Sequence, residues 1–295
     1  MSNKRIETTT SRTAEWTCLS RAVSSLEEDD CYRSDDTIAL QLLPARIKLI
    51  FGNPPVRKYI YRLIPAKGMY EYVIARTKYI DAVFKEALAG RFDQILIFGA
   101  GFDTRALRFR EISGTTKIFE LDAAITQEAK IAQYHKRGLT IPPNLTFIQI
   151  DFDKDSLSAK LEAAGFDRHK KSLFVLEGLL MYLQPESVDE TFRIIRDFAG
   201  TGSQVVFDHV YSSVLRHEEL YDGERKIVEQ VLKAGESWQF GIEKGGIEQF
   251  LSSYDFRLCE QRDASQLEQI YFKDPTGKIA GHVNGTHCLV RAEKI

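Results

Sequence analysis

The sequence predicts an α/β fold in which a mostly parallel sheet has helices on both faces and ends in an antiparallel hairpin. Short runs rich in β-branched and aromatic residues alternate with helix-length segments through the middle of the chain. These runs are apolar on both faces, which is typical of strands that are covered on each side. Near the C-terminus, two more strand-like runs flank a turn sequence, "KDPTGK".

Residues 16–90 have the spacing of helices, after a polar stretch over residues 1–15. "TIALQLLPARIKLIF" (37–51) and "YEYVIARTKYIDAVFKEALAG" (70–90) both place apolar residues three and four positions apart. We expect the second helix to stop at Gly90, a residue type favoured at helix C-termini. The sequence therefore predicts an N-terminal helical cap, residues 1–90, on a core of residues 91–295, the two forming one compact unit.

The core divides into strands, helices and one long connection. The candidate parallel strands are 94–99, 116–122, 145–151, 172–178 and 203–210. The candidate helices are 123–137, 155–164, 186–199 and 245–256, and the hairpin strands are 267–272 and 286–292. Residues 211–244 are long for a strand-to-helix connection, so we expect an inserted lid that helps to select the substrate.

Composition argues against several classes of protein. The 295 residues carry a net charge of −2 and scattered basic residues, so we expect no nucleic-acid partner. The four cysteines have no CxxC spacing, which argues against a metal site or a redox pair. So few cysteines in a chain of this length argue against a disulfide framework, so we expect a reducing, cytoplasmic compartment. We also expect no membrane segment, because the N-terminal stretch lacks an apolar signal core and no apolar run reaches the roughly 18 residues that cross a bilayer. No heptad pattern is sustained, so the sequence predicts no particular oligomeric state.

The first candidate strand runs into a glycine loop, "QILIFGAGFDTR" (94–105). A dinucleotide fold has GxGxxG here, whereas this chain has Gly99 and Gly101 followed by Thr104 in place of the third glycine. No GxxxxGK[ST] phosphate loop occurs either. Asp103 and Thr104 are candidate N-caps of the next helix, Arg105 could pair with a carboxylate, and Asp103 is also a candidate contact of a ligand amine. The loop predicts a nucleoside ligand without a pyrophosphate.

Acidic residues gather at the ends of the candidate parallel strands, where ligands bind in this type of sheet. They are Glu120, Asp122, Asp151, Glu177 and Asp208. S-adenosylmethionine has no phosphate, and its ribose diol, amine and sulfonium suit carboxylates, so the sequence favours it over NAD. Glu120 and Asp122 lie about twenty residues after the glycines, where an acid accepts hydrogen bonds from ribose hydroxyls. Taken singly, an acid at such a position could instead be a helix N-cap or a solvated loop residue.

The motifs "GAGFDTRALRF", "FELD", "IDF" and "LEGLLMYL" resemble the leucine carboxyl methyltransferase family, and its bacterial and polyketide-pathway members most of all. The resemblance covers most of the chain, although the C-terminal half matches in pattern more than in motifs. It implies a Rossmann-like class I methyltransferase fold with a seven-stranded sheet, and S-adenosylmethionine as the cofactor.

The resemblance also implies roles for single residues. Arg76, in "ARTKYID", would hold the carboxylate of the cofactor in the bidentate grip that a guanidinium suits. The other matching positions are Gly99 in the loop, Asp122 at the ribose, Asp151 and Phe152 at the adenine, and Glu177 beside the cofactor.

The methyl acceptor is what the sequence defines least. A carboxylate is already ionised at neutral pH and needs no general base, which favours a methyl ester on a small molecule such as a polyketide-like metabolite. A hydroxyl would need a base, for which His209 is the candidate, with Tyr182 lining the pocket. Equally, His209 could be a loop histidine and Tyr182 a core residue. The other interpretations are a protein C-terminal carboxylate as acceptor, an NAD-dependent oxidoreductase, and a binding protein without activity.

Overall fold

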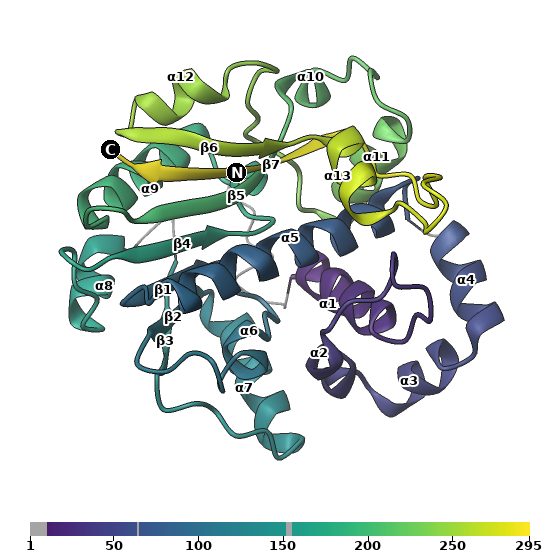
Figure 1. Ribbon diagram of the computed structural model, residues 1–295, viewed down its shortest axis with the longest axis horizontal. Coiled ribbons are helices and arrows are strands. Elements are labelled where there is room, and N and C mark those ends of the chain that lie inside the picture. The colour runs from purple at the N-terminus through teal and green to yellow at the C-terminus, as the bar shows by residue number, and fades with distance from the viewer. Residues whose placement is uncertain (1–10, 64, 152–154) are drawn as a thin grey trace.

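The computed structural model describes residues 11–63, 65–151 and 155–295, and these form a seven-stranded sheet with helices around it (Figure 1). The strands are β1 (Gln94–Phe98), β2 (Lys117–Asp122), β3 (Leu145–Gln149), β4 (Ser172–Leu176), β5 (Gln204–Val210), β6 (Phe256–Arg262) and β7 (His287–Lys294). Neighbouring strands among the first five are parallel, and β7 is antiparallel to both of its neighbours. This arrangement confirms the predicted α/β fold with a terminal antiparallel hairpin.

The strand order is β3-β2-β1-β4-β5-β7-β6, so the chain winds outwards in one direction from β1 and in the other direction from β4. These two strands pair in parallel, from Gln94 with Ser172 to Phe98 with Leu176. The carboxyl ends of β1 and β4 therefore flank the point at which the strand order reverses. Open α/β sheets bind their ligands in the crevice outside this point.

Two hydrophobic clusters cover the two faces of the sheet. On one face, α5 (Met69–Ala89), α6 (Arg105–Arg108), α7 (Ala124–Lys136) and α13 (Ala264–Tyr271) pack against strand residues such as Ile95 and Val206. On the other face, α8 (Leu157–Ala163), α9 (Pro185–Phe198) and α12 (Ile247–Ser252) pack against residues such as Leu96 and Phe207. Alternate residues of each strand thus point to opposite helical layers. None of the helices within the described ranges is long and apolar enough to cross a membrane.

The N-terminal helices lie beside the carboxyl ends of the parallel strands (Figure 1). They are α1 (Arg12–Ser24), α2 (Thr37–Leu42), α3 (Ala45–Phe51) and α4 (Pro54–Leu63). The helical pattern over residues 37–51 is divided into α2 and α3 at Pro44, because the proline ring cannot continue the hydrogen bonds of a helix. α5 crosses the sheet and ends at Ala89 with Gly90 as its C-cap, as predicted.

The hairpin strand predicted at residues 267–272 was wrong. Most of those residues belong to α13, which begins with a capping box between Asp263 and Gln266. The partner of β7 is instead β6, an edge strand in which Phe256 is the only fully buried residue, so its sequence has little apolar alternation. The turn sequence "KDPTGK" follows α13 and joins no two strands of the sheet.

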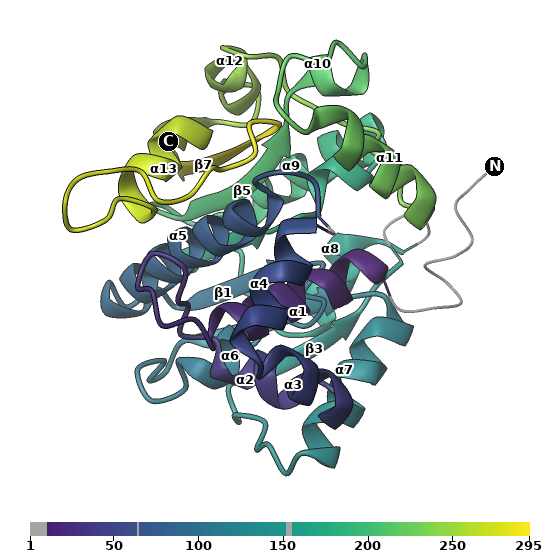
Figure 2. The same ribbon diagram turned by 90° about the vertical axis from the view of Figure 1, so that its right-hand side faces the viewer.

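The segment 211–244 contains α10 (Ser212–Leu215) and α11 (Glu224–Ala234), which lie together at the top of Figure 2. Its end returns to β5, where Ile242 N donates to Val210 O at 3.0 Å. Just before that, Gln239 N donates to Met181 O at 2.7 Å, in the short 3-10 helix η1 (Leu180–Tyr182) that follows β4. The segment therefore lies against the carboxyl ends of β4 and β5.

Candidate active site

The glycine loop leaves β1 with two residues in the left-handed region. Gly99 has a φ of 57° and Gly101 a φ of 49°, which residues with a Cβ rarely adopt. A Cβ on Gly99 would lie 3.0 Å from Leu179 Cδ1, and one on Gly101 would lie 3.2 Å from the Cβ of Ala14 in α1. Backbone conformation and close packing both require glycine at these positions.

Asp122 lies at the end of β2, beside this loop. Its carboxylate accepts hydrogen bonds from Gly101 N and, at 2.7 Å, from Ala123 N. Burial raises the pKa of Asp122, and the two backbone donors act against that rise. The structure thus brings together the loop and the acid that the sequence singled out.

Arg105 is the centre of a buried cluster of ion pairs. From α6, its Nε donates to Asp81 of α5 at 2.7 Å, and its Nη1 donates to Asp103 and, at 2.7 Å, to Glu177. Only 2% of Arg105 is exposed, and buried charges of this kind need partners. The expected pairing of Arg105 with a carboxylate is confirmed. Asp103 also accepts from Arg105 N at 2.7 Å, so both of its oxygens are engaged within the loop.

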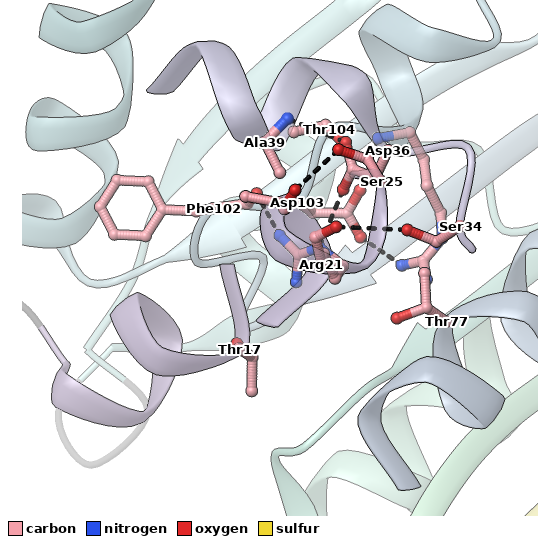
Figure 3. A network of polar contacts seen from close by, with 12 residues as sticks. Thr17, Arg21, Ser25, Ser34, Asp36, Ala39, Thr77, Phe102, Asp103 and Thr104 are labelled. Carbon is pink, nitrogen blue, oxygen red and sulfur yellow. Dashed lines mark hydrogen bonds and ion pairs between the residues drawn. The ribbon is translucent and has the colours of Figure 1, made fainter. Parts of the chain in front are cut away.

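A second group of contacts ties the loop to the first helices (Figure 3). Arg21 of α1 donates to Asp36 at 2.9 Å and to the Phe102 carbonyl at 2.7 Å. The Thr104 hydroxyl donates to the same Asp36 at 2.6 Å. Helix α6 begins after Thr104, as predicted for an N-cap, but the side chain of Thr104 makes no capping hydrogen bond. Sequence reasoning missed Arg21 and Asp36, because no short-range pattern connects them to the loop.

Arg76 lies on α5 with two carboxylates from neighbouring strands. Its Nε donates to Glu177 at 3.0 Å and its Nη1 to Asp208 at 2.8 Å. Burial acts to raise the pKa of Glu177, but Arg105 and Arg76 hold it down at about 2. Within the described part of the chain, Arg76 Nη2 makes no hydrogen bond, so this nitrogen is available to an anionic ligand group.

Asp208 joins α5 to the end of β4. It is fully buried, and it accepts from Tyr72 Oη at 2.7 Å, from Arg76 at 2.8 Å and from Gly178 N at 2.5 Å. Gly178 has a φ of 60°, which turns the chain sharply after Glu177. Asp208 therefore fixes the turn that positions Glu177 between two arginines. The sequence marked Asp208 as a strand-end acid, whereas Tyr72 was missed among the many apolar residues of α5.

Glu120 lies away from the loop, under α7. Its carboxylate accepts from Lys130 Nζ at 2.6 Å, and both side chains are 1% exposed. Burial raises the pKa of Glu120 to about 7 even though Lys130 opposes this rise. Glu120 lies two residues before Asp122, on the same face of the sheet but further from the carboxyl end of β2. It therefore pairs with Lys130 of α7 and does not reach the rim of the site.

The adenine-side prediction is only partly within the described residues. Asp151 follows β3, and its backbone N–H donates to Asp155 Oδ2 at 2.9 Å. It therefore lies at the same edge of the sheet as Asp122, because β2 and β3 are parallel neighbours. Phe152 lies outside the described residues.

The two predicted catalytic residues lie on different faces. Tyr182 is in η1, where burial raises its pKa and the side chains of Trp238 and Thr13 lie near its hydroxyl. His209 follows Asp208 in β5 and therefore points to the opposite helical layer, against Phe207. Burial lowers the pKa of His209 to about 4, and its Nδ1 contacts Val210 O at 2.9 Å. The structure does not bring His209 together with the other candidate residues.

A different histidine lies on the face of the candidate site. His287, at the start of β7, lies against Tyr72 with ring centroids 4.4 Å apart and the rings tilted by 32°, and the Trp238 ring lies nearly perpendicular to it at 5.2 Å. The antiparallel pairing sets His287 opposite Val210, the last residue of β5. The start of β7 therefore lies at the edge where the parallel strands end. Sequence reasoning missed His287 because it considered only the last residues of the strands, and His287 is the first residue of an antiparallel strand.

The polar atoms suit an organic ligand with both positive and negative groups. The glycine loop, Asp122 and Asp151 border one side, and Arg76 and Glu177 the other. Arg105 Nη2 is enclosed without a hydrogen-bond partner, a further donor that the described residues leave unused. Within the same described ranges, no group of three or more His, Cys, Asp and Glu residues could hold a metal ion.

Comparison with known proteins identifies relatives among methyltransferases. A protein of Mycobacterium marinum named "Putative S-adenosyl-L-methionine-dependent methyltransferase" is 36% identical over 143 residues, which are 48% of this chain and 47% of that protein. A protein of Mycobacterium avium with the same name is 30% identical over 202 residues, 68% of this chain and 61% of that protein. The matches thus span about half to three fifths of these relatives' length.

Two solved structures share the fold. A structure described as a putative methyltransferase from Thermobifida fusca has a TM-score of 0.61 at 15% identity, over 96% of this chain and 97% of that one. A protein from Streptomyces avermitilis has a TM-score of 0.57 at 11% identity, over 94% and 97%. At such identities the likeness concerns the class I methyltransferase-like fold. The model of the family described as "Leucine carboxyl methyltransferase" matches residues 14–196, more than half of the sequence. The chain therefore belongs to the leucine carboxyl methyltransferase family.

Proposed function

We propose that this protein is an S-adenosylmethionine-dependent O-methyltransferase whose acceptor is a small molecule. The observation that carries the proposal is Arg76, buried beside the glycine loop with one nitrogen left for an anionic group. The named relatives of the family support the choice of donor.

The residues present fit this donor group by group. Arg76 Nη2 would bind its carboxylate, a charge-assisted hydrogen bond of the stronger kind. Asp122 would accept from the ribose hydroxyls, and Asp151 would face the amino group of the adenine. Glu177, whose pKa is held at about 2, is ionised and suits the ammonium and sulfonium charges. The glycine loop would let the ligand approach the backbone.

When bound, this donor supplies a methyl group on a positively charged sulfur, and the chain supplies alignment and exclusion of water. We propose that residues 211–244 act as the lid. Gln239 N and Phe240 N both lie at the Met181 carbonyl, so the segment already rests on η1. Trp238 comes just before this contact and would close the acceptor compartment against Tyr182.

Two classes of acceptor oxygen fit the proposal. The family description points to a carboxylate, which needs alignment but no base. Other contacts favour a hydroxyl. Arg76 is paired with Glu177 and Asp208, and its remaining nitrogen is assigned to the donor, so it is not left for an acceptor carboxylate. A neutral histidine, His287, lies close to Arg76. A protein C-terminus is a third acceptor to test. The family assignment gives no support to an NAD-dependent oxidoreductase.

The experiment combines binding and turnover. Calorimetry with adenosylhomocysteine should detect a single site, and NAD should not bind. Incubation with methyl-labelled S-adenosylmethionine and a panel of carboxylic acids, phenols, alcohols and carboxyl-terminal peptides should transfer label to oxygen in small molecules. Absence of adenosylhomocysteine binding, or label found only in nitrogen or peptide products, would contradict the proposal.

A further inference from the structure

A chain of hydrogen bonds leads from the loop before β7 to His287. The Asn284 amide donates from Nδ2 to Lys67 O at 2.9 Å and to Asp222 O at 3.2 Å. The Thr286 hydroxyl donates to Asn284 Oδ1 at 2.5 Å, and Thr286 N donates to the same oxygen at 3.1 Å. The Thr286 oxygen then lies 2.7 Å from His287 Nδ1.

This chain fixes where the proton of the imidazole lies. The carbonyls of Lys67 and Asp222 can only accept, so the nitrogen of the Asn284 amide must face them and its oxygen must face Thr286. The single hydroxyl proton of Thr286 is used towards Asn284 Oδ1. Towards His287, the Thr286 oxygen can therefore only accept, and Nδ1 must carry the hydrogen.

The other ring nitrogen is left with its lone pair. Burial lowers the pKa of His287 to about 3, and Asp208 opposes this, whereas Arg76 and His209 act in the same direction as burial. The ring is neutral at pH 7, so Nε2 is an acceptor. No residue in the described chain donates a hydrogen bond to it. Its neighbours are the rings of Tyr72 and Trp238.

We propose that His287 Nε2 accepts the hydrogen bond of the acceptor, and that the acceptor is therefore a hydroxyl compound rather than a carboxylate. This inference rests on the proposed function and names the substrate class for the same site. A hydroxyl carries the proton that a bare Nε2 lacks. An ionised carboxylate has no proton to offer it, and would lie close to the buried carboxylate of Asp208, whose charge Arg76 already balances.

The reaction at the acceptor balances without a further reagent. The acceptor oxygen forms a bond to the methyl carbon while the bond from that carbon to sulfur breaks, and the sulfur keeps the electron pair. The hydroxyl proton moves to His287 Nε2 as the oxygen becomes strongly acidic on methylation, so a weakly basic imidazole suffices. The imidazolium then releases the proton to water.

The first test is a measurement on the protein without any acceptor. The ¹⁵N spectrum of histidine-labelled protein should give His287 the pattern of a neutral ring protonated on Nδ1. Thr286→Val removes the partner of Nδ1 and should shift the ring towards the Nε2–H form, because the valine offers no acceptor. His209→Phe identifies the signals of the other buried ring. Protonation of Nε2, or a charged ring at pH 7, in the unaltered protein would overturn the proposal.

The second test uses matched acceptors that differ only in the reacting group, namely 2-naphthol with 2-naphthoic acid and 1-octanol with octanoic acid. His287→Phe keeps an aromatic ring against Tyr72 but removes the lone pair. We expect kcat with the hydroxyl members to fall about 100-fold, the usual size of a lost general base. Thr286→Val should lower it roughly tenfold, the size of one hydrogen bond. Transfer to the acids alone, or an equal fall for both members, would overturn the proposal.

The two tests separate this inference from the proposed function. If adenosylhomocysteine fails to bind the unaltered protein, the proposed function fails, whatever the form of His287. If adenosylhomocysteine binds and His287→Phe leaves its Kd unchanged, a loss confined to hydroxyl transfer supports the inference alone. If none of the four acceptor compounds is methylated, the ¹⁵N spectrum of His287 alone supports or overturns the inference.

Discussion

The proposed donor side and the proposed acceptor side of the candidate site consist of different kinds of residue. The donor side consists of charged residues that pair with each other, namely Arg21, Asp36, Arg76, Asp81, Asp103, Arg105 and Glu177. All of them lie within the stretch that the family model matches. The acceptor side consists of Tyr72, Tyr182, Trp238 and His287, and the last two lie outside that stretch.

The difference teaches where change is tolerated. Removing one member of a buried ion-pair cluster leaves buried charges with fewer partners, so we expect the donor side to resist substitution. An aromatic side chain that lines a pocket can be replaced by another apolar side chain of similar volume with a smaller loss of stability. We therefore expect substitutions to be tolerated less on the first side than on the second.

The largest expected effect comes from breaking the donor side at its centre. Arg105→Ala would leave Asp81, Asp103 and Glu177 without their shared partner, so we expect the free energy of unfolding to fall by about 3–5 kcal/mol. Urea denaturation would measure it. Arg216→Ala is the matched control, because Arg216 pairs with two glutamates on the surface and its loss should have no measurable effect. Equal stability of the two variants would contradict the comparison.

The next effect separates binding from stability. Arg76→Lys keeps a positive charge but loses the guanidinium fork, so we expect the Kd for adenosylhomocysteine to rise about tenfold, equivalent to about 1.4 kcal/mol. Titration calorimetry would measure it, with the exposed Arg110→Lys as control. An unchanged Kd in Arg76→Lys would remove Arg76 from the proposed donor site.

A pH series compares Glu177 of the proposed donor side with Glu120, which lies under α7 and outside that side. The pKa of Glu120 is raised from 4.5 to about 7, so its contribution to stability is present below 4.5 and is lost as the pH rises to 7. The pKa of Glu177 is lowered to about 2, so its contribution is present above 4.5 and is lost as the pH falls towards 2. Glu120→Gln should therefore flatten the fall in unfolding free energy between about pH 5 and about pH 7. An unchanged slope would show that Glu120 titrates normally.

The smallest effect is expected on the acceptor side. Tyr72→Phe removes one of three hydrogen bonds to Asp208 and keeps the ring that contacts His287. We expect a stability loss of about 1 kcal/mol and no change in the Kd for adenosylhomocysteine. The exposed Tyr59→Phe is the control for both measurements. A loss as large as that of Arg105→Ala would mean that the two sides are not energetically distinct.

The fold could be predicted because its signals are local. Each of the five parallel strands was expected within two residues at either end, and α5 was expected to end at Gly90, because apolar runs and glycine punctuation act over a few residues. Strand β6 was missed, since an edge strand is solvated on one side and its polar residues obscure the period of two.

Residues of the candidate site could be predicted only on strands whose parallel direction followed from the sequence pattern. Reading the carboxyl ends of parallel strands found Asp122, Glu177 and Asp208, which the structure brings to one edge. The same rule could not find His287, because β7 is antiparallel and brings its first residue to that edge. Nor could it find Arg21, whose partner in the loop lies 81 positions away in the sequence.

The contact of Arg21 with Asp36 and the Phe102 carbonyl has a consequence for how the protein melts. Helix α1, the start of α2 and the glycine loop share one set of buried charges, so none of them can detach and leave the others satisfied. A cap that unfolded before the sheet would take away both Asp36 and Arg21, and would leave Arg108 and the Thr104 hydroxyl without Asp36 and the Phe102 carbonyl without its donor. The N-terminal helices and the sheet are therefore expected to unfold together in one calorimetric transition, as a single cooperative unit.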